Sequence, residues 1–433
     1  MLKFLHAADI HLDSPLRGLE KYEGAPLEAM RKATQRALRN MVDLAISEEV
    51  KFILISGDLY DGDWRDYRTG LLFAKEMSRL REAGINVFIV FGNHDAASQI
   101  TKRLDNMPKN VFHFPIKAPD SIILEDQGVV IHGRGFPTRA VTEDLSAAYP
   151  EAVPGLYNIG MLHSCATGRE GHEPYAPCSI DKLLSKHYHY WALGHVHKRE
   201  ILHQDPWIVF PGNIQGRHIR ETGPKGCTLV TVEGSHTVSV EPKSLEALRW
   251  EMSEIDCTDT TNPDEVMELI GRDVLRKSEK CDDIPLVVRI VLSGISQVHQ
   301  ELSINPEKWT SEIRARVTDE TGGRVGIEKI RINTRPANES DRSSEIKGPL
   351  WSLLTSLRSL KESQVVGQGL TENEMELREM VSDDLTRLKA RLPIEMRTEG
   401  GEVGLDSNET FKEALQAAGN MLLSMLSSKR DEK

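Results

Sequence analysis

Short, continuous apolar runs alternate with amphipathic stretches over the first 240 residues of the chain. The runs at 2–8, 52–56 and 87–91 are too short for helices and predict buried strands. Between these runs, Leu27–Glu49 and Leu71–Ala83 carry apolar residues at helical spacing. Further strands are expected at Val129–His132, Ile159–Leu162, Trp191–Leu193, Ile208–Phe210 and Cys227–Glu233. Continuously apolar strands are typical of sheets covered on both faces, so we predict an α/β fold with two packed sheets and outer helices.

The pattern of apolar positions changes after residue 240, and 433 residues are too many for one ordinary core. A small α+β unit is predicted with strands at 249–256, 286–293 and 325–333 and helices at 262–277 and 305–319. The polar stretch Asn333–Gly348 indicates a linker, and three amphipathic helices are expected beyond it. We therefore expect three domains, at 1–240, 245–335 and 336–433.

The net charge of −12 is unevenly distributed. Residues 1–240 hold 27 Lys and Arg against 29 Asp and Glu, whereas residues 241–433 hold 27 against 37. The acidity of the whole chain therefore does not exclude a nucleic-acid partner for the first part. The apolar stripes of the C-terminal helices either dock on a partner's coiled coil or cover this protein's own core. The polar linker and the acidic excess favour docking.

The five cysteines are scattered, odd in number and without a Cys-x-x-Cys pair. This usage predicts free thiols in a reducing cytoplasm rather than a disulfide framework or a zinc site. The first residues do not resemble a signal peptide, and no run approaches the roughly 20 apolar residues of a membrane helix. We expect a cytoplasmic protein that does not bind membranes.

Short polar motifs follow the predicted strands, where α/β proteins gather their ligands. In chain order they are Asp9-Ile10-His11, Gly57-Asp58, Gly92-Asn93-His94-Asp95, a lone His163 and Gly194-His195-Val196-His197. In an extended segment, Asp-x-His and His-x-His each place two side chains on the same side. Any one motif is common by chance, but the ordered set, with its glycine-flanked turns, is not.

These residue types suit the hydrolysis of a phosphate ester by two divalent cations. Two ions roughly 3.5–4 Å apart neutralise phosphoryl charge and generate hydroxide at neutral pH. The predicted ligands are Asp9, His11, Asp58, Asn93, His163, His195 and His197. Asp58 suits a bridging position, and Asn93 adds a neutral oxygen. Nitrogen and oxygen ligands favour Mn²⁺ or iron, although imidazoles leave zinc open.

Over roughly residues 1–240 the ordered motifs resemble the signature of calcineurin-like metallophosphoesterases. The longer stretches His6–Gly18 and Phe210–Gly226 resemble SbcD-type DNA repair nucleases, more specifically their YhaO-like branch. The resemblance implies a manganese-dependent DNA exonuclease and endonuclease with a two-sheet αββα core and a small capping domain. It also implies a homodimer and an SbcC-type coiled-coil ATPase as partners.

Roles for individual residues follow from the same resemblance. One ion would be held by Asp9, His11, Asp58 and His197, and the other by Asp58, Asn93, His163 and His195. His94 would face the phosphate and protonate the leaving oxygen, which typically contributes about 10²–10⁴-fold. We hypothesise that Asp95 orients His94, the alternative being that Asp95 caps a turn.

Three further residues, Arg217, His218 and Arg220, follow a predicted strand and are expected to contact nucleic-acid phosphates, unless they form a solvated loop. In some SbcD-like nucleases a histidine in the loop after the second motif helps to place the substrate. Here that loop reads Leu59-Tyr60-Asp61-Gly62-Asp63. His6 lies inside the first predicted strand, where we expect it to pack rather than to bind metal.

The leading hypothesis is therefore a DNA phosphodiesterase. One alternative is the same chemistry on a phosphoprotein or a small nucleotide, because the metal motifs alone do not select a substrate. Another is a non-catalytic scaffold for DNA ends that serves the ATPase, which the intact ligand set disfavours.

Overall fold

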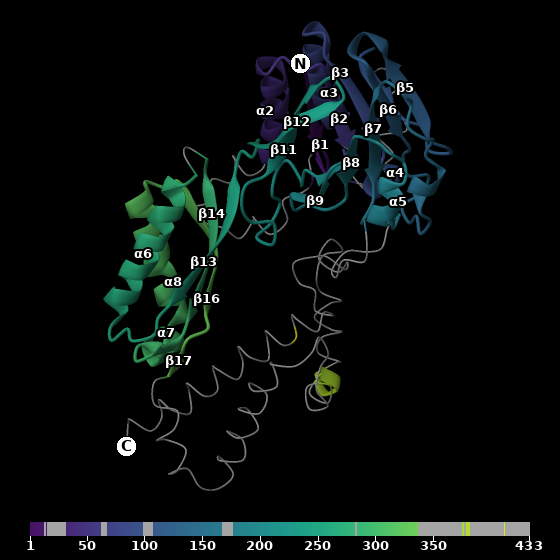
Figure 1. The fold of residues 1–433 in the computed structure, drawn as a ribbon. Coiled ribbons are helices and arrows are strands. Elements are labelled where there is room, and N and C mark those ends of the chain that lie inside the picture. Colours follow the sequence, from purple (N-terminus) through teal and green to yellow (C-terminus); the bar gives the residue numbers. More distant parts are fainter. Residues whose placement is uncertain are drawn as a thin grey trace, which may run out of the picture. The chain divides into compact units, whose positions relative to one another are not determined.

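The computed structural model describes two compact units, shown in Figure 1. Described are residues 1–12, 14, 32–61, 67–97, 107–166, 176–281, 284–336, 375, 378–381 and 411. The first unit holds the described residues up to Glu251 together with Cys281 and 284–287. The second holds the described residues from 252 to 280 and from 288 onward. The predicted C-terminal helices fall almost entirely outside the described residues, and the predicted domain boundaries stay predictions.

The first sheet of the first unit has the strand order β12-β11-β1-β2-β3-β4 in the described part of the chain. Its strands are β1 (Leu2–Ala7), β2 (Phe52–Ser56), β3 (Asn86–Val90), β4 (Val111–His113), β11 (Gly226–Glu233) and β12 (His236–Ser244). β1 to β4 are parallel, whereas β11 pairs antiparallel with both β1 and β12. The carboxyl ends of β1, β2 and β3 therefore meet at one edge of this sheet.

The second sheet has the order β5-β6-β7-β8-β10-β9 over the described residues. Its strands are β5 (Asp120–Leu124), β6 (Val129–Gly133), β7 (Tyr157–His163), β8 (Tyr190–Gly194), β9 (Glu200–Gln204) and β10 (Trp207–Phe210). β6, β7, β8 and β10 are parallel, and the edge strands β5 and β9 are antiparallel to their neighbours.

An apolar layer joins the two sheets face to face. Phe4, Phe52 and Phe88 of the first sheet belong to the same buried cluster as Ile159 and Met161 of the second. The opposite faces of β2 and β7 are buried as well, which explains the apolar runs 52–55 in β2 and 159–162 in β7. The two-sheet α/β core predicted from the sequence is thus confirmed.

The outer faces of the sheets are covered differently. Helices α2 (Ala33–Ser47) and α3 (Tyr67–Glu82) pack on the first sheet through residues such as Met41 and Phe73. On the second sheet, Trp191 and Leu193 pack against short pieces that include η3 (Leu145–Ala148) and α5 (Ile180–Leu184). Two long outer helices are therefore described on the first sheet, of which α2 covers only part of the predicted Leu27–Glu49, while bulky side chains and short helices cover the second.

The second unit contains a three-stranded sheet of order β13-β14-β16 and the helices α6 and α8. Its elements are β13 (Arg249–Asp256), α6 (Pro263–Glu279), β14 (Leu286–Ser293), β15 (Ile295–Ser296), α7 (His299–Ile304), α8 (Pro306–Thr321), β16 (Val325–Ile332) and β17 (Arg335–Pro336). Asn262 caps α6 by accepting a bond from the backbone of Glu265 at 3.1 Å, and Gly322 ends α8 in a left-handed conformation. These local signals agree with the prediction of both helices, whose observed ends lie within about two residues of the predicted ones.

All five cysteines are buried and free, as their spacing predicted. Among the residues that the structure describes, none of the helices combines the length and the apolar character that a bilayer crossing requires.

Candidate metal centre

The five polar motifs meet at the carboxyl ends of neighbouring strands. Asp9 and His11 follow β1, Asp58 follows β2, and the short helix α4 (Asn93–Ala97) follows β3. The second sheet contributes His163, the last residue of β7, and the loop after β8. Backbone bonds join the loops, because the N–H groups of Asp9 and His11 donate to the carbonyls of Gly57 and Asp58 at 3.0 and 2.9 Å.

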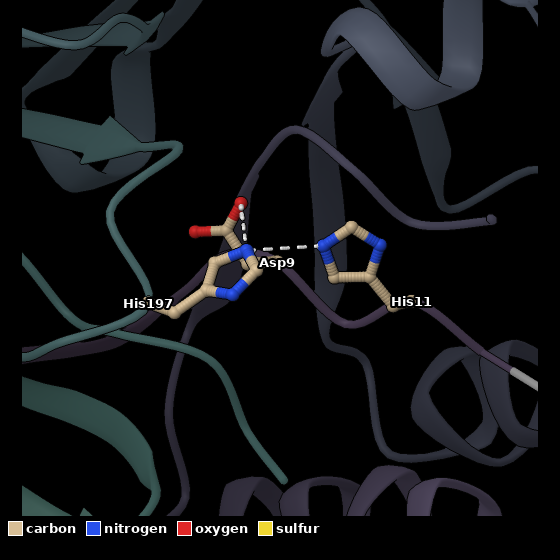
Figure 2. A group of neighbouring side chains, drawn as sticks. All are labelled: Asp9, His11 and His197. Carbon is tan, nitrogen blue, oxygen red and sulfur yellow. Dashed lines mark hydrogen bonds and ion pairs between the residues drawn. The ribbon is translucent and has the colours of Figure 1, made fainter. Parts of the chain in front are cut away.

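Asp9, His11 and His197 form what we term the outer group (Figure 2). The His197 Nε2 atom lies 3.2 Å from His11 Nε2 and 3.9 Å from Asp9 Oδ1. Two nitrogens that each bind one cation at about 2.0–2.1 Å lie roughly 3–3.5 Å apart when their bonds meet near the tetrahedral or octahedral angle. The spacing of the two imidazoles therefore fits a shared metal ion.

The inner group consists of Asp58, His163 and His195, whose ligand atoms all lie within 4.8 Å of one another. His163 Nε2 lies 3.4 Å from Asp58 Oδ2 and 3.0 Å from Asn93 Oδ1. Asp58 Oδ2 is also 3.9 Å from His11 Nε2, so this carboxylate faces both groups. The structure thus brings all seven predicted side chains together, with Asp58 in the position suited to bridging.

Several of these residues have an unusual backbone. Asp9, His11 and Asp58 have φ angles of 51°, 44° and 53°, and His195 has a φ of 100°. A residue other than glycine in this region costs about 1–3 kcal/mol and persists only where the surrounding structure holds it. Here the His195 N–H donates to the Asp9 carboxylate at 3.0 Å. Strain concentrated at the predicted ligands is typical of a functional site.

The glycines that flank the motifs allow this close approach. A Cβ atom on Gly57 would collide with the His163 ring, one on Gly92 with the Asp58 side chain, and one on Gly194 with the Ser56 carbonyl oxygen. Gly57 also has a φ of +91°. The two sheets can therefore bring their ligand loops together only where side chains are missing.

Each of two imidazoles is fixed through the nitrogen that faces away from the centre. His163 Nδ1 donates to the Ser56 carbonyl at 2.9 Å, and His197 Nδ1 donates to Glu221 Oε1 at 2.7 Å. A carbonyl or carboxylate oxygen only accepts, so both Nδ1 atoms carry the proton. The Nε2 atoms then face the centre, where each can hold either a proton or, through its lone pair, a metal ion.

Electrostatics at the centre favour a positive charge. Burial alone would lower the pKa of His163, but the charge and hydrogen bond of Asp58 outweigh it and raise that pKa to about 9. Burial raises the pKa of Asp9, although the neighbouring imidazoles oppose the shift. Buried carboxylates beside imidazoles therefore attract a cation, whether a proton or a metal ion.

His94 lies beside both groups and is held by a carboxylate. Its backbone N–H donates to Asp58 Oδ1 at 2.9 Å, and its Nδ1 lies 2.8 Å from Asp61 Oδ1. Burial lowers the pKa of His94, but the Asp61 hydrogen bond and the Asp58 charge outweigh it, so the pKa is raised. Its ring, together with His11 and Asp58, also has the spacing of a metal group, so distance alone does not separate His94 from the ligands.

Asp95, the hypothesised partner of His94, makes a different set of bonds. Its carboxylate accepts backbone N–H bonds from Leu59 at 3.2 Å, Tyr60 at 3.0 Å and Gly92 at 3.0 Å. These bonds fix two ligand loops against each other, which is the turn-capping alternative.

Of the three predicted phosphate contacts, Arg217 lies at the centre. Its Nη1 is 3.9 Å from Asp61 Oδ2, and its Nη2 is 3.4 Å from Glu221 Oε1. His218 and Arg220 are exposed, with His218 Nε2 3.7 Å from Glu221 Oε1. Arg217 thus lies beside His197 at the metal groups, and the other two are exposed on the same loop.

Comparisons with known proteins match both units. The calcineurin-like phosphoesterase family matches residues 2–199, and the middle domain of metallophosphoesterase YhaO matches residues 250–335. The uncharacterized metallophosphoesterase YhaO of Bacillus subtilis is 37% identical over 297 residues, which are 68% of this chain and 72% of that protein. The chain belongs to the calcineurin-like metallophosphoesterases. The resemblance to this family and to its YhaO-like branch is confirmed, and with it a phosphoesterase whose family uses a dinuclear metal centre.

Other relatives of this metallophosphoesterase are more distant. The DNA double-strand break repair protein Mre11 of Sulfurisphaera tokodaii is 26% identical over 248 residues, which cover 54% of this chain and 60% of that protein. Mre11 of Sulfolobus acidocaldarius is 26% identical over 250 residues, with coverages of 54% and 61%. The chain thus spans about three fifths of these archaeal proteins. A solved dimetal phosphatase from Danio rerio matches with 11% identity and a TM-score of 0.31, covering 53% of this chain and 92% of that one.

Sequence reasoning missed two carboxylates of this metallophosphoesterase, Asp61 and Glu221. Asp61 lies in the loop noted for its missing histidine, and Glu221 lies in the stretch that carried the family resemblance. Asp61 was visible as a second carboxylate three positions after Asp58. No local pattern pairs Glu221 with His197, because 24 positions separate them.

Proposed function

We propose that this metallophosphoesterase is a metal-dependent DNA phosphodiesterase, with exonuclease and endonuclease activity, that acts in DNA repair. The observation that carries the proposal is that Asp58 faces both the outer and the inner group, with His94 directly beside it. The substrate is supported by the relatives named DNA double-strand break repair proteins.

Two divalent cations, which we propose to be Mn²⁺, would bind the seven converging side chains. One would bind Asp9, His11, Asp58 and His197, and the other Asp58, Asn93, His163 and His195. When bound, such a pair of ions neutralises phosphoryl charge and supplies a hydroxide nucleophile at neutral pH. The set of carboxylate, amide and imidazole ligands suits Mn²⁺.

The proposed general acid is His94. Because Asp61 can only accept, His94 Nδ1 carries a proton, and Nε2 is left to pass a proton to the leaving oxygen. The His94 side chain is 31% exposed, so a substrate can reach it. Asp95 acts indirectly in this scheme, since its bonds to the loop backbones hold the segment that carries His94.

Arg217 is the proposed phosphate contact nearest the ions, with His218 and Arg220 extending the contact along the DNA backbone. The Arg217 guanidinium lies close to the Asp61 and Glu221 carboxylates, which hold it beside the centre. Guanidinium groups suit phosphate because they donate two parallel hydrogen bonds.

The SbcC-type ATPase and the homodimer are proposed from the family resemblance. The region proposed to dock the ATPase, within 336–433, lies almost entirely outside the described residues. Co-purification of the full chain with the ATPase would test the first proposal, and sedimentation of the full chain would test the second.

Cleavage assays test the substrate. The Mn²⁺-loaded protein, with its ATPase partner present, is expected to cleave linear and hairpin DNA as well as bis-p-nitrophenyl phosphate. If it cleaves the small ester and leaves all DNA intact, the phosphodiesterase stands and the nuclease proposal fails.

Replacement of His94 tests catalysis against a scaffold role. His94→Ala is expected to lower the rate of DNA cleavage by about 10²–10⁴-fold, because a general acid is lost, while Mn²⁺ and DNA binding persist. His236→Ala, at an exposed histidine of β12, is the control and should leave the rate unchanged. An unchanged rate in His94→Ala would contradict the role of His94, and absence of cleavage by the unaltered protein would favour the scaffold.

A further inference from the structure

The buried carboxylate of Glu221 occupies a position that no metal motif includes. Its Oε1 atom lies 2.7 Å from His197 Nδ1. Its Oε2 atom accepts two bonds, from the Asn213 side-chain amide at 2.9 Å and from the Arg217 backbone N–H at 2.7 Å. Oε1 also lies 3.4 Å from Arg217 Nη2, and only Oε1 is turned to a predicted metal ligand.

His197 Nδ1 has two neighbours with opposite demands. Glu221 Oε1 can only accept a hydrogen bond, whereas the Arg217 guanidinium, whose Nη2 lies 3.4 Å from the same nitrogen, can only donate one. The first neighbour requires a proton on Nδ1, and the second requires a lone pair there. The Glu221 contact is shorter and charge-assisted, so it prevails.

The choice of tautomer decides whether His197 can bind metal. With the proton on Nδ1, the lone pair sits on Nε2, the atom that lies 3.2 Å from His11 Nε2 and 3.9 Å from Asp9 Oδ1. With the proton on Nε2, the imidazole would direct an N–H at the centre and could not bind a cation there.

We propose that Glu221 is a positioning residue that selects the Nδ1–H tautomer of His197 against the competing demand of Arg217, and so makes the outer group competent to bind its metal ion. The inference rests on the proposed function, because it takes His197 as a ligand. It adds a reason for Glu221 to be present. Without this carboxylate, Arg217, the proposed phosphate contact, would donate to His197 Nδ1 and leave the proton on Nε2, so that His197 could not bind metal.

The isosteric substitution Glu221→Gln reverses the hydrogen-bond demand at His197. Two N–H donors, the Asn213 amide and the Arg217 backbone, lie 2.9 and 2.7 Å from the Oε2 position, whereas the donor at Oε1, Arg217 Nη2, is 3.4 Å away, so the amide oxygen of Gln belongs at Oε2. The amide NH₂ must then face His197 Nδ1 and donate to it. The variant is therefore expected to move the imidazole proton to Nε2 without changing the size of the side chain.

Two measurements on the full-length protein test this expectation. The ¹⁵N chemical shifts of His197 in the metal-free protein report its tautomer, which should change from Nδ1–H to Nε2–H in Glu221→Gln. Titration with Mn²⁺ alone should show one of two sites weakened by about 10–100-fold, with the other close to unaltered. An unchanged tautomer together with wild-type affinity at both sites would overturn the proposal.

A matched control is Glu246→Gln, at a second buried carboxylate of the same unit. Glu246 accepts bonds from the Lys225 backbone and from Arg249 rather than from a predicted ligand. The Glu246→Gln variant should therefore leave the His197 tautomer and both Mn²⁺ affinities unchanged. Equal losses of Mn²⁺ affinity in the two variants would indicate general destabilisation and contradict the role given to Glu221.

A second pair of variants keeps the test open if Glu221→Gln folds poorly. Glu221→Ala leaves the Arg217 guanidinium as the polar neighbour of His197 Nδ1, and Glu221→Ala/Arg217→Met removes both. The double variant should bind Mn²⁺ more tightly at the outer group than the single variant does. Equal affinities would contradict the competition between the two side chains.

His197→Ala separates this inference from the proposed function. If His197→Ala binds Mn²⁺ as the unaltered protein does, the metal assignment itself is wrong. If His197→Ala loses one ion but Glu221→Gln loses none, the metal assignment stands and only the role of Glu221 fails.

Discussion

The inner and outer groups fix their imidazoles by different means. In the inner group, the fully buried His163 donates to the main-chain carbonyl of Ser56 and packs against the backbone of Gly57. In the outer group, His197 has a side chain 24% exposed and is held by the carboxylate of Glu221. One imidazole of the inner group is therefore held by the main chain, and one imidazole of the outer group by a side chain.

This difference predicts different sensitivities to substitution. A site held by the backbone depends on shape, because any added atom meets a strand or a ring that cannot move. A site held by side chains depends on charge and hydrogen-bond direction, because the loop has room but the imidazole needs the correct neighbour. His94, held by Asp61, follows the second pattern.

The largest effect is expected from Gly57→Ala, which breaks the inner group. Its φ of +91° is strained for alanine, and the new Cβ would collide with the His163 ring. Strain and overpacking together should lower the free energy of unfolding by about 2–5 kcal/mol. Urea unfolding measures the loss.

Gly84→Ala is the control for this prediction. Gly84 has a φ of +73°, but no atom lies within 4 Å of its added Cβ. Only the backbone strain remains, so the expected loss of unfolding free energy is about 1–2 kcal/mol. Equal losses in the two variants would mean that the contact with His163 contributes nothing.

A smaller effect is expected from Asp61→Asn, which extends the comparison to His94. Loss of the carboxylate beside His94 Nδ1 should lower kcat by about 10–100-fold, by analogy with other carboxylate–histidine pairs, while stability is retained.

Asp95→Asn should instead lower the stability of the protein and leave kcat close to unchanged. The amide oxygen would keep the two bonds now made by Oδ2, and the NH₂ would face the Tyr60 N–H donor, which should lower the free energy of unfolding by about 1–3 kcal/mol.

Paired measurements of kcat and of urea midpoints separate the two aspartates. If Asp95→Asn is as stable as the unaltered protein but loses kcat, then Asp95 orients His94 after all, and the capping role is wrong.

The smallest effect concerns His6, which is as buried as His163 but has neutral hydrogen-bond partners, the Tyr190 hydroxyl and the Leu193 carbonyl. Burial lowers the pKa of His6 to about 3, and the Arg199 charge acts in the same direction. The unfolded chain therefore binds the proton first as the pH falls, and stability present above pH 6.5 is lost between pH 6.5 and about 3. The loss amounts to about 1.4 kcal/mol per pH unit.

His6→Gln removes this contribution to the pH dependence. Between pH 7.5 and 5.5 the unaltered protein should lose about 1 kcal/mol more unfolding free energy than the variant does. Urea unfolding at the two pH values measures the difference, and parallel losses would show that burial of His6 does not control its protonation.

The sequence by itself determined the α/β class, the inner strands of both sheets and the order of the metal motifs, whereas the edge strands β4, β5, β9 and β12 were not predicted. The continuous apolar runs of β2 and β7 required strands buried on both faces, and Asp9, Asp58 and His195 follow such strands directly. These features are readable because backbone preference and side-chain period act over a few neighbouring residues. The identities of the seven converging side chains could be predicted for the same reason.

Only the tertiary structure decided which side chains hold the centre in place. Asp61 pairs with His94 across 33 positions, and Glu221 pairs with His197 across 24. Such contacts depend on how loops that are distant in the sequence pack, and carboxylates elsewhere in these loops look the same in the sequence. Local pattern therefore predicts the groups that would touch metal, whereas the directions of His94, His163 and His197 are set by hydrogen bonds that exist only once loops distant in the sequence have packed together.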